Sequence, residues 1–134
     1  MATVTLFNTF VEDAVTGKHN LATDTLKVVL SNTAPLASNT VLANITQIAA
    51  GNGYLTGGVT ATVSSLSQTA GKLTLILSGV SWTASGGDIA ANRYAVLYND
   101  TATGDPLIAW LDLGVSAVVA SGNDLDVSGA WIDG

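Results

Sequence analysis

The sequence has no cysteine, so disulfide bonds and thiolate chemistry are excluded. Histidine is nearly absent as well, since His19 is the only one. A zinc site needs several such ligands, and a Ser-His-Asp triad would have to use His19 as its base. His19 lies in the polar turn 17–20, and no Gly-x-Ser-x-Gly turn is present. We therefore interpret His19 as a solvated turn residue and predict no catalytic residue, metal or cofactor.

Charge is also scarce. Only 10% of the residues are charged, against about 25% in an average soluble domain. With four basic residues and a net charge of −6, the chain has no patch that would neutralise phosphates, so we expect no nucleic-acid partner. A surface with so few charges predicts that other subunits cover part of it. An ordinary Ala/Thr-rich β domain is the alternative interpretation, and composition does not separate the two.

Long apolar runs are missing. No stretch approaches the roughly 20 apolar residues that span a bilayer, so we expect no membrane contact. The N-terminal MATVTLFNTF has neither the basic region nor the apolar core of a secretion signal. We expect the protein to be made and used in a cytoplasm, or assembled there.

Alternating apolar and polar residues dominate what is present. Residues 92–99 and 107–114 both alternate with period two, which predicts two strands joined by the polar turn 100–106. Further strands are expected at residues 3–6, 24–30, 59–64, 73–78, 115–119 and 125–131. About eight short strands with frequent turn signals are typical of an antiparallel sandwich. We predict a mostly β, antiparallel β-sandwich, jelly-roll-like, as one domain over residues 1–134.

One N-terminal segment breaks the period of two. Apolar residues at positions 7, 10, 11, 14 and 15 follow helical spacing, and Gly17 is a plausible stop. We predict a short helix near residues 7–16. An extended conformation of the same residues is the alternative.

Paired carboxylates are the remaining candidates for chemistry. Asp100 and Asp105 lie in one turn and offer oxygen ligands for calcium, although Asp is also favoured in turns for local reasons. Asp124 and Asp126 are two apart on a strand and share a face, as an acid pair would. Exposed strand carboxylates also discourage edge-to-edge aggregation. We favour the structural interpretation of both pairs. Of the functions considered for this chain, an enzyme is the one that the sequence supports least.

Several short segments follow one another along the chain in a recognisable order. They are Asp24 to Leu30 (DTLKVVL), Gly51 to Tyr54 with Gly57 and Gly58, Val80 to Trp82 (VSW), Arg93 to Asp100 (RYAVLYND) and Asp105 to Gly114 (DPLIAWLDLG). Their order and spacing resemble a family of small virion structural proteins of tailed bacteriophages. The similarity runs through nearly the whole chain. It implies a β-rich fold and a role as capsid cement, also called decoration, or as another accessory virion component. It implies no catalytic residue.

We therefore expect a capsid cement protein that bridges and stabilises capsid subunits, on the capsid surface of a virion. Its expected partners are the major capsid protein and copies of itself in a homo-oligomer. The alternative is a tail-associated receptor- or glycan-binding module. In that case Trp82, Trp110 and Trp131 would supply stacking platforms for sugars.

The interface candidates are Ile108, Trp110, Trp131 and Trp82. Strict alternation assigns Leu107, Ala109, Leu111 and Leu113 to the core. Ile108, Trp110 and Asp112 then share the opposite face, a mixture that is typical of protein interfaces. We expect Trp110→Ala to weaken subunit association and Leu111→Ala to destabilise the fold.

Overall fold

The computed structural model describes residues 3–133, and it is mostly β, with 51% of residues in strands and 7% in helix. The strands are β1 (Thr3–Leu6), β2 (Leu26–Ser31), β3 (Val59–Thr69), β4 (Lys72–Ser78), β5 (Ser81–Thr83), β6 (Ile89–Asn99), β7 (Leu107–Val119), β8 (Asp124–Asp126) and β9 (Gly129–Asp133). The helices are α1 (Phe10–Val15) and the short 3-10 helix η1 (Leu42–Asn44). No helix within residues 3–133 is long and apolar enough to cross a membrane.

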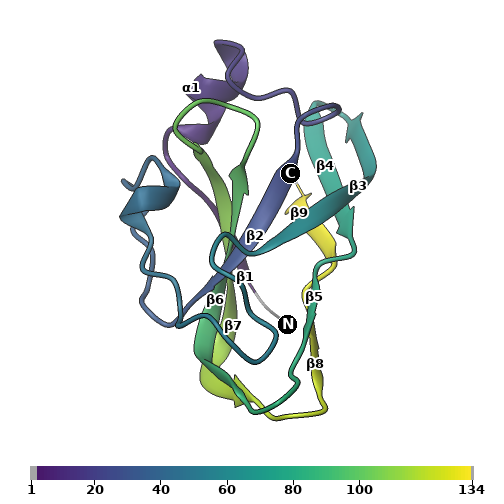
Figure 1. Ribbon diagram of the computed structural model, residues 1–134. Helices are drawn as coiled ribbons and strands as arrows, with labels where there is room; N and C mark the ends of the chain where they lie inside the picture. Colours follow the sequence, from purple (N-terminus) through teal and green to yellow (C-terminus); the bar gives the residue numbers. More distant parts are fainter. Residues whose placement is uncertain (1–2, 134) are drawn as a thin grey trace.

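Seven strands form one antiparallel sheet in the order β1-β7-β6-β2-β3-β4-β9, while β5 and β8 form a separate two-stranded ribbon. The large sheet curls until it is nearly closed into a barrel, with β3, β4 and β9 facing β6 and β7 across the interior (Figure 1). The predicted antiparallel, sandwich-like fold is confirmed. A single curled sheet takes the place of the two separate sheets of a jelly roll.

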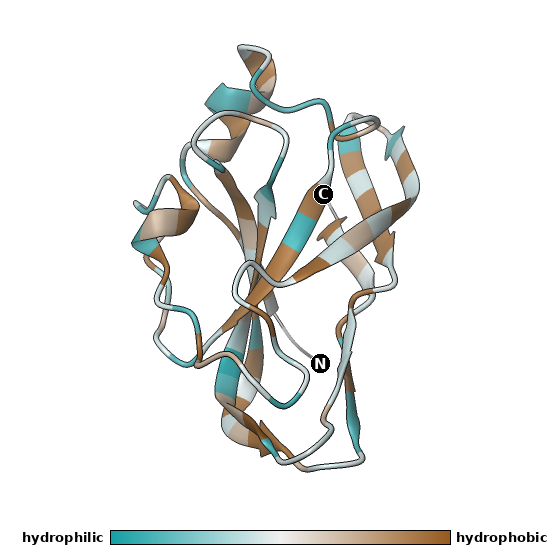
Figure 2. Cartoon of the chain, viewed as in Figure 1, coloured by the Kyte–Doolittle hydropathy of each residue, from teal (hydrophilic) through white to brown (hydrophobic). Residues whose placement is uncertain are grey.

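Two hydrophobic clusters lie on the two faces of the central strands. Along β6, Ala95 and Leu97 enter the main cluster inside the curled sheet, while Val96 and Tyr98 enter a smaller cluster on its outside. Phe7 and the segment after η1 cover that outer cluster. Strand β2 is accordingly apolar along most of its length (Figure 2). Central strands covered on both faces were predicted from the sequence, and this part of the sheet confirms them.

A β-bulge overturns the predicted faces of β7. Tyr98 pairs with Leu107 and Leu97 pairs with Ala109, so Ile108 is an extra residue between two ladder positions. A bulge of this kind shifts the alternation by one residue. Ile108 and Ala109 therefore both enter the main cluster, whereas Leu107 and Trp110 belong to the outer one. The assignment of Ile108 to an exposed face was wrong for this reason.

The short N-terminal helix is confirmed but covers only part of its predicted range. Phe7 precedes it, and α1 ends at Val15. Phe10 anchors the helix in the main cluster, while Val11 and Val15 are 60% and 81% exposed. Helical spacing identified the element, but a six-residue helix has too few turns to bury the whole predicted stripe.

Candidate interaction surface

Three of the four predicted interface residues lie in the interior. Trp82, Trp131 and Ile108 are 2%, 1% and 0% exposed, and all three belong to the main cluster. The indole N–H of Trp131 donates a 2.9 Å hydrogen bond to the carbonyl oxygen of Val127, as expected for a buried tryptophan. These three side chains cannot meet a partner while the chain is folded. Trp82 and Trp131 are equally unavailable as stacking platforms for a sugar.

Trp110 is the one predicted interface residue with accessible surface. It is partly buried, and its ring packs against Phe7 with 4.7 Å between the ring centroids and a tilt of 53°. The contact joins β7 to the segment that leads into α1. Trp110 therefore serves the outer cluster and also presents an edge to solvent.

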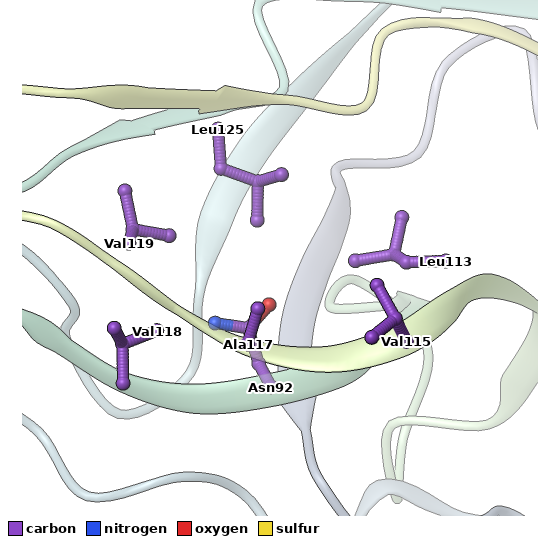
Figure 3. Close-up of a pocket in the computed structure, with 7 residues that line it drawn as sticks. All are labelled: Asn92, Leu113, Val115, Ala117, Val118, Val119 and Leu125. Carbon is purple, nitrogen blue, oxygen red and sulfur yellow. The ribbon is translucent and has the colours of Figure 1, made fainter.

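An open apolar hollow lies at the other end of the β6–β7 hairpin. It has a volume of about 290 Å³ and is bounded by the β7 end on one side and by Leu125 of β8 on the other (Figure 3). Val115 and Val118 are 65% and 52% exposed beside it. Its lining is Asn92, Leu113, Val115, Ala117, Val118, Val119 and Leu125.

Sequence reasoning missed this surface because residues 115–119 also read as an ordinary short strand. The available signal was charge rather than hydropathy. No charged residue occurs between Asp112 and Asp124, a stretch of eleven residues. An uncharged, exposed strand end is unusual on a protein surface, where large apolar patches mark interaction sites.

The outer edge of β7 is unpaired beside the hollow. Strand β1 pairs with residues 109–112 of β7, with Thr3 opposite Asp112. No strand within residues 3–133 pairs with that edge from Val115 to Val119. On its other side this part of β7 pairs with β6 only at Asn92 and Ile89, across two register shifts. The segment therefore has free backbone donors and acceptors along an apolar hollow.

The charges near the hollow are acidic. Arg93 is the only basic residue between positions 84 and 128, and it pairs with Asp112 through Nε and Oδ1 at 2.9 Å. This hydrogen-bonded pair raises the pKa of Arg93 and lowers that of Asp112. Asp88, Asp124 and Asp126 are exposed.

The acid-pair hypothesis gains nothing from the geometry. Asp126 accepts a 2.8 Å hydrogen bond from the backbone N–H of Ser128, and hydrogen bonding to Ser128 lowers the pKa of Asp126. A general acid needs a raised pKa, and Asp126 has the opposite shift. Within residues 3–133, His, Asp and Glu side chains form no cluster of three that could hold a metal ion. In the proposed calcium turn, Asp100 pairs with Lys27 at 3.6 Å.

His19 is buried, contrary to the solvated turn residue that the sequence predicted. It is 8% exposed, and its ring lies 5.5 Å from that of Phe10. Its Nδ1 atom is 3.0 Å from the side-chain nitrogen Nδ2 of Asn99, the last residue of β6. The polar sequence around His19 gave no sign that α1 and the β6 end would enclose it.

Comparisons of this chain with known protein families, with curated proteins and with solved structures find no match.

Proposed function

We propose that the chain is a bacteriophage virion structural protein that acts as capsid cement, bridging and stabilising neighbouring capsid subunits. The observation that carries the proposal is the uncharged, exposed apolar end of β7 with its hollow, on a surface that is otherwise poor in charge. Soluble proteins rarely expose such patches unless they bind something. The resemblance of the ordered segments between Asp24 and Gly114 to small phage virion proteins supports the same role.

The physical role of a cement protein is binding free energy. A molecule that binds the assembled shell, and not the free subunits, shifts the equilibrium toward the shell. Each Å² of apolar surface that leaves water contributes about 25 cal/mol. Val115, Val118 and the hollow between them offer apolar surface for such contacts without having to desolvate a charge.

The nearly closed sheet suits this role. Near closure leaves few strand edges unpaired within residues 3–133, and one of them, Val115 to Val119 of β7, lies beside the apolar hollow. Contact with the shell would cover that edge and the hollow together. We include copies of the chain among its partners, with the exposed edge of Trp110 as the candidate contact.

Location on the particle is the first test. Labelled antibody against this protein, applied to intact virions in electron micrographs, should decorate the shell. Label confined to the tail tip would overturn the proposal and favour a tail-associated module. That alternative now depends on Trp110 alone, since Trp82 and Trp131 are buried. A glycan array with the wild-type protein and Trp110→Ala tests it directly.

Addition to empty shells is the second test. Purified protein should bind expanded, undecorated shells and raise the temperature at which they disassemble. Val115→Asp should reduce this binding, because it places a charge at the hollow. Val11→Asp is the matched control, since Val11 is a similarly exposed valine, 60% against 65% for Val115, and lies on α1, away from the hollow. Sedimentation of the free protein separately reports whether it forms homo-oligomers.

A further inference from the structure

We infer that the free edge of β7, residues 115–119, accepts an extended segment of another protein as an added β-strand. The inference deepens the proposed function and rests on it only for the source of that segment, a shell subunit. The strand-accepting edge itself is argued from the geometry. The segment that fits is apolar at alternate positions and carries basic residues at its ends.

The unpaired backbone is the first argument. The described residues of β1 pair with β7 as far as Asp112, and no strand within residues 3–133 pairs with the edge from Val115 to Val119. An extended peptide can satisfy such an edge with main-chain hydrogen bonds, while pockets for alternate side chains give specificity. A protein that had no use for a long free edge would shorten it or place charges along it. Residues 115–119 carry no charge.

The hollow is the second argument. Val115, Ala117 and Val119 occupy alternate positions of β7 and line it together. Leu125 of the β5–β8 ribbon points into it from the opposite side (Figure 3). A strand added beside β7 would direct every second side chain to the same side as these residues, because alternate residues share a face. Apolar side chains at those positions would fill the hollow.

Charge identifies the partner. Asp88, just before β6, and Asp124 and Asp126, on either side of Leu125 in β8, are exposed near the hollow, and Arg93 is already paired with Asp112. These acidic surroundings attract an apolar segment with Lys or Arg at its ends and repel an acidic one. A second copy of this chain is a poor occupant, because it carries a net charge of −6 and only four basic residues.

Synthetic peptides test this surface with the intact protein. The probe is a fluorescein-labelled peptide of alternating valine and threonine with two lysines at each end. The first control replaces those lysines with glutamates. Two further controls carry N-methyl groups on every second amide. In one control these groups block one edge of the peptide, and in the other they block the opposite edge. Fluorescence anisotropy at low salt reports binding, and hydrogen exchange reports protection of residues 115–119.

We expect the lysine-flanked peptide to bind about tenfold or more tightly than the glutamate-flanked one, and added salt to reduce the difference. One of the two N-methylated peptides should fail to bind and the other should bind normally, since an added strand pairs with β7 through only one of its edges. Val115→Asp should weaken binding by about tenfold, and the similarly exposed Val11→Asp on α1 should not change it. Amides in residues 115–119 should exchange more slowly when the peptide is bound.

Three results would overturn the inference. These are no peptide binding at millimolar concentration, equal binding of both N-methylated peptides, or binding without protection of residues 115–119. None of these bears on where the protein lies in the particle. Antibody label on the shell together with failed peptide binding would leave the cement role standing and remove this mode of contact. Antibody label on the tail together with successful peptide binding would remove the cement role and leave the strand-accepting edge standing.

Discussion

The two halves of the β6–β7 hairpin belong to the same two strands but differ in how deeply their residues are buried. Near the connecting turn, residues 95–99 and 107–109 are all buried. We call this the closed half. At the far end, residues 89–92 and 113–119 form the open half, where residues 114–118 are all exposed. The closed half is flanked by β2 and β1 and covered on both faces by the two clusters. In the open half only one face is covered, because Ile89 and Val119 belong to the main cluster and none of its residues belongs to the outer one.

The strand pairing differs in the same way. The closed half has a continuous ladder apart from the bulge at Ile108. The open half has register shifts between Ile89 and Asn92 and again between Asn92 and Tyr94. Neighbouring strands and packed side chains impose regular pairing, and bulges accumulate where these are missing. Apolar sequence alone therefore did not decide which half is core, because both halves are apolar.

Glycine substitutions should separate the two environments most strongly. A Cβ on Gly58 would clash with the carbonyl oxygen of Val28 on β2, whose pairing partner is Leu97 of the closed half. A Cβ on Gly114, in the open half, would meet nothing within 4 Å. Both glycines have positive φ, which costs an L-residue roughly 1–2 kcal/mol. We expect Gly114→Ala to lose about that much and Gly58→Ala to lose about 4 kcal/mol or more, or not to fold.

Urea unfolding of both variants measures this difference. If Gly58→Ala and Gly114→Ala lose equal stability, the close approach of Gly58 to β2 is not rigid. Retention of the far-UV circular dichroism spectrum by Gly114→Ala would verify that the open half tolerates the change.

Truncation of an apolar side chain should have the next largest effect. Leu97 is fully buried in the closed half, and Leu97→Ala should cost about 2–5 kcal/mol through lost burial and the cavity that remains. Val118 is 52% exposed in the open half, and Val118→Ala should change stability by less than about 0.5 kcal/mol. Chemical denaturation compares the two. A large loss in Val118→Ala would mean that the open half is part of the core.

The period of two predicted the closed half well. Residues 92–99 and 107–114 were recognised as paired strands from their alternation and from the turn sequence 100–106, and β6 and β7 confirm them. What the pattern could not supply was the bulge. One extra residue at Ile108 reverses the phase of β7, so its predicted inward and outward faces were exchanged locally. Local sequence contains no marker for that residue.

The candidate site was harder to predict for a different reason. Trp82, Trp110 and Trp131 were chosen because tryptophan is common at interfaces, but it is equally common in cores, and two of the three are buried. Whether an apolar strand end is covered depends on strand order. Within the described residues, β1 pairs with β7 only as far as Asp112, which no pattern within β7 reveals.

Trp110 lies where the closed half meets solvent, and its truncation should have an intermediate effect. Its contact with Phe7 and its partial burial predict that Trp110→Ala lowers stability by about 1–3 kcal/mol, less than a buried tryptophan would. The folded fraction should also associate less, if its exposed edge contacts another copy. Thermal melts and sedimentation velocity measure the two effects. Unchanged sedimentation would remove Trp110 from the interface candidates.

The smallest effect concerns His19, a buried titratable group that contacts Asn99 at the end of the closed half. Asn99 accepts hydrogen bonds on Oδ1 from the N–H groups of Thr101 and Ala102, and its Nδ2 donates to Asp24 Oδ2 at 2.7 Å. These contacts fix the amide so that its other N–H faces His19 Nδ1, which must accept. Neutral His19 therefore carries its proton on Nε2, and a second proton on Nδ1 would face a donor.

Acid should for this reason weaken the closed half before its carboxylates titrate. Burial lowers the pKa of His19 below its ordinary 6.5, outweighing the opposite influence of Asp13 and Asp24, while Lys18 lowers it further. Between pH 6.5 and that lower pKa the unfolded chain binds more protons than the folded one, so the free energy of unfolding falls as pH falls. The stabilising carboxylates Asp24 and Asp112 have pKa values below 3.8 and do not contribute in this window. His19→Gln can still accept from Asn99 and cannot titrate. We therefore expect the free energy of unfolding in urea to fall more between pH 7 and pH 5 in the wild type than in His19→Gln. Equal losses would mean that His19 is protonated as readily in the folded chain as in the unfolded one.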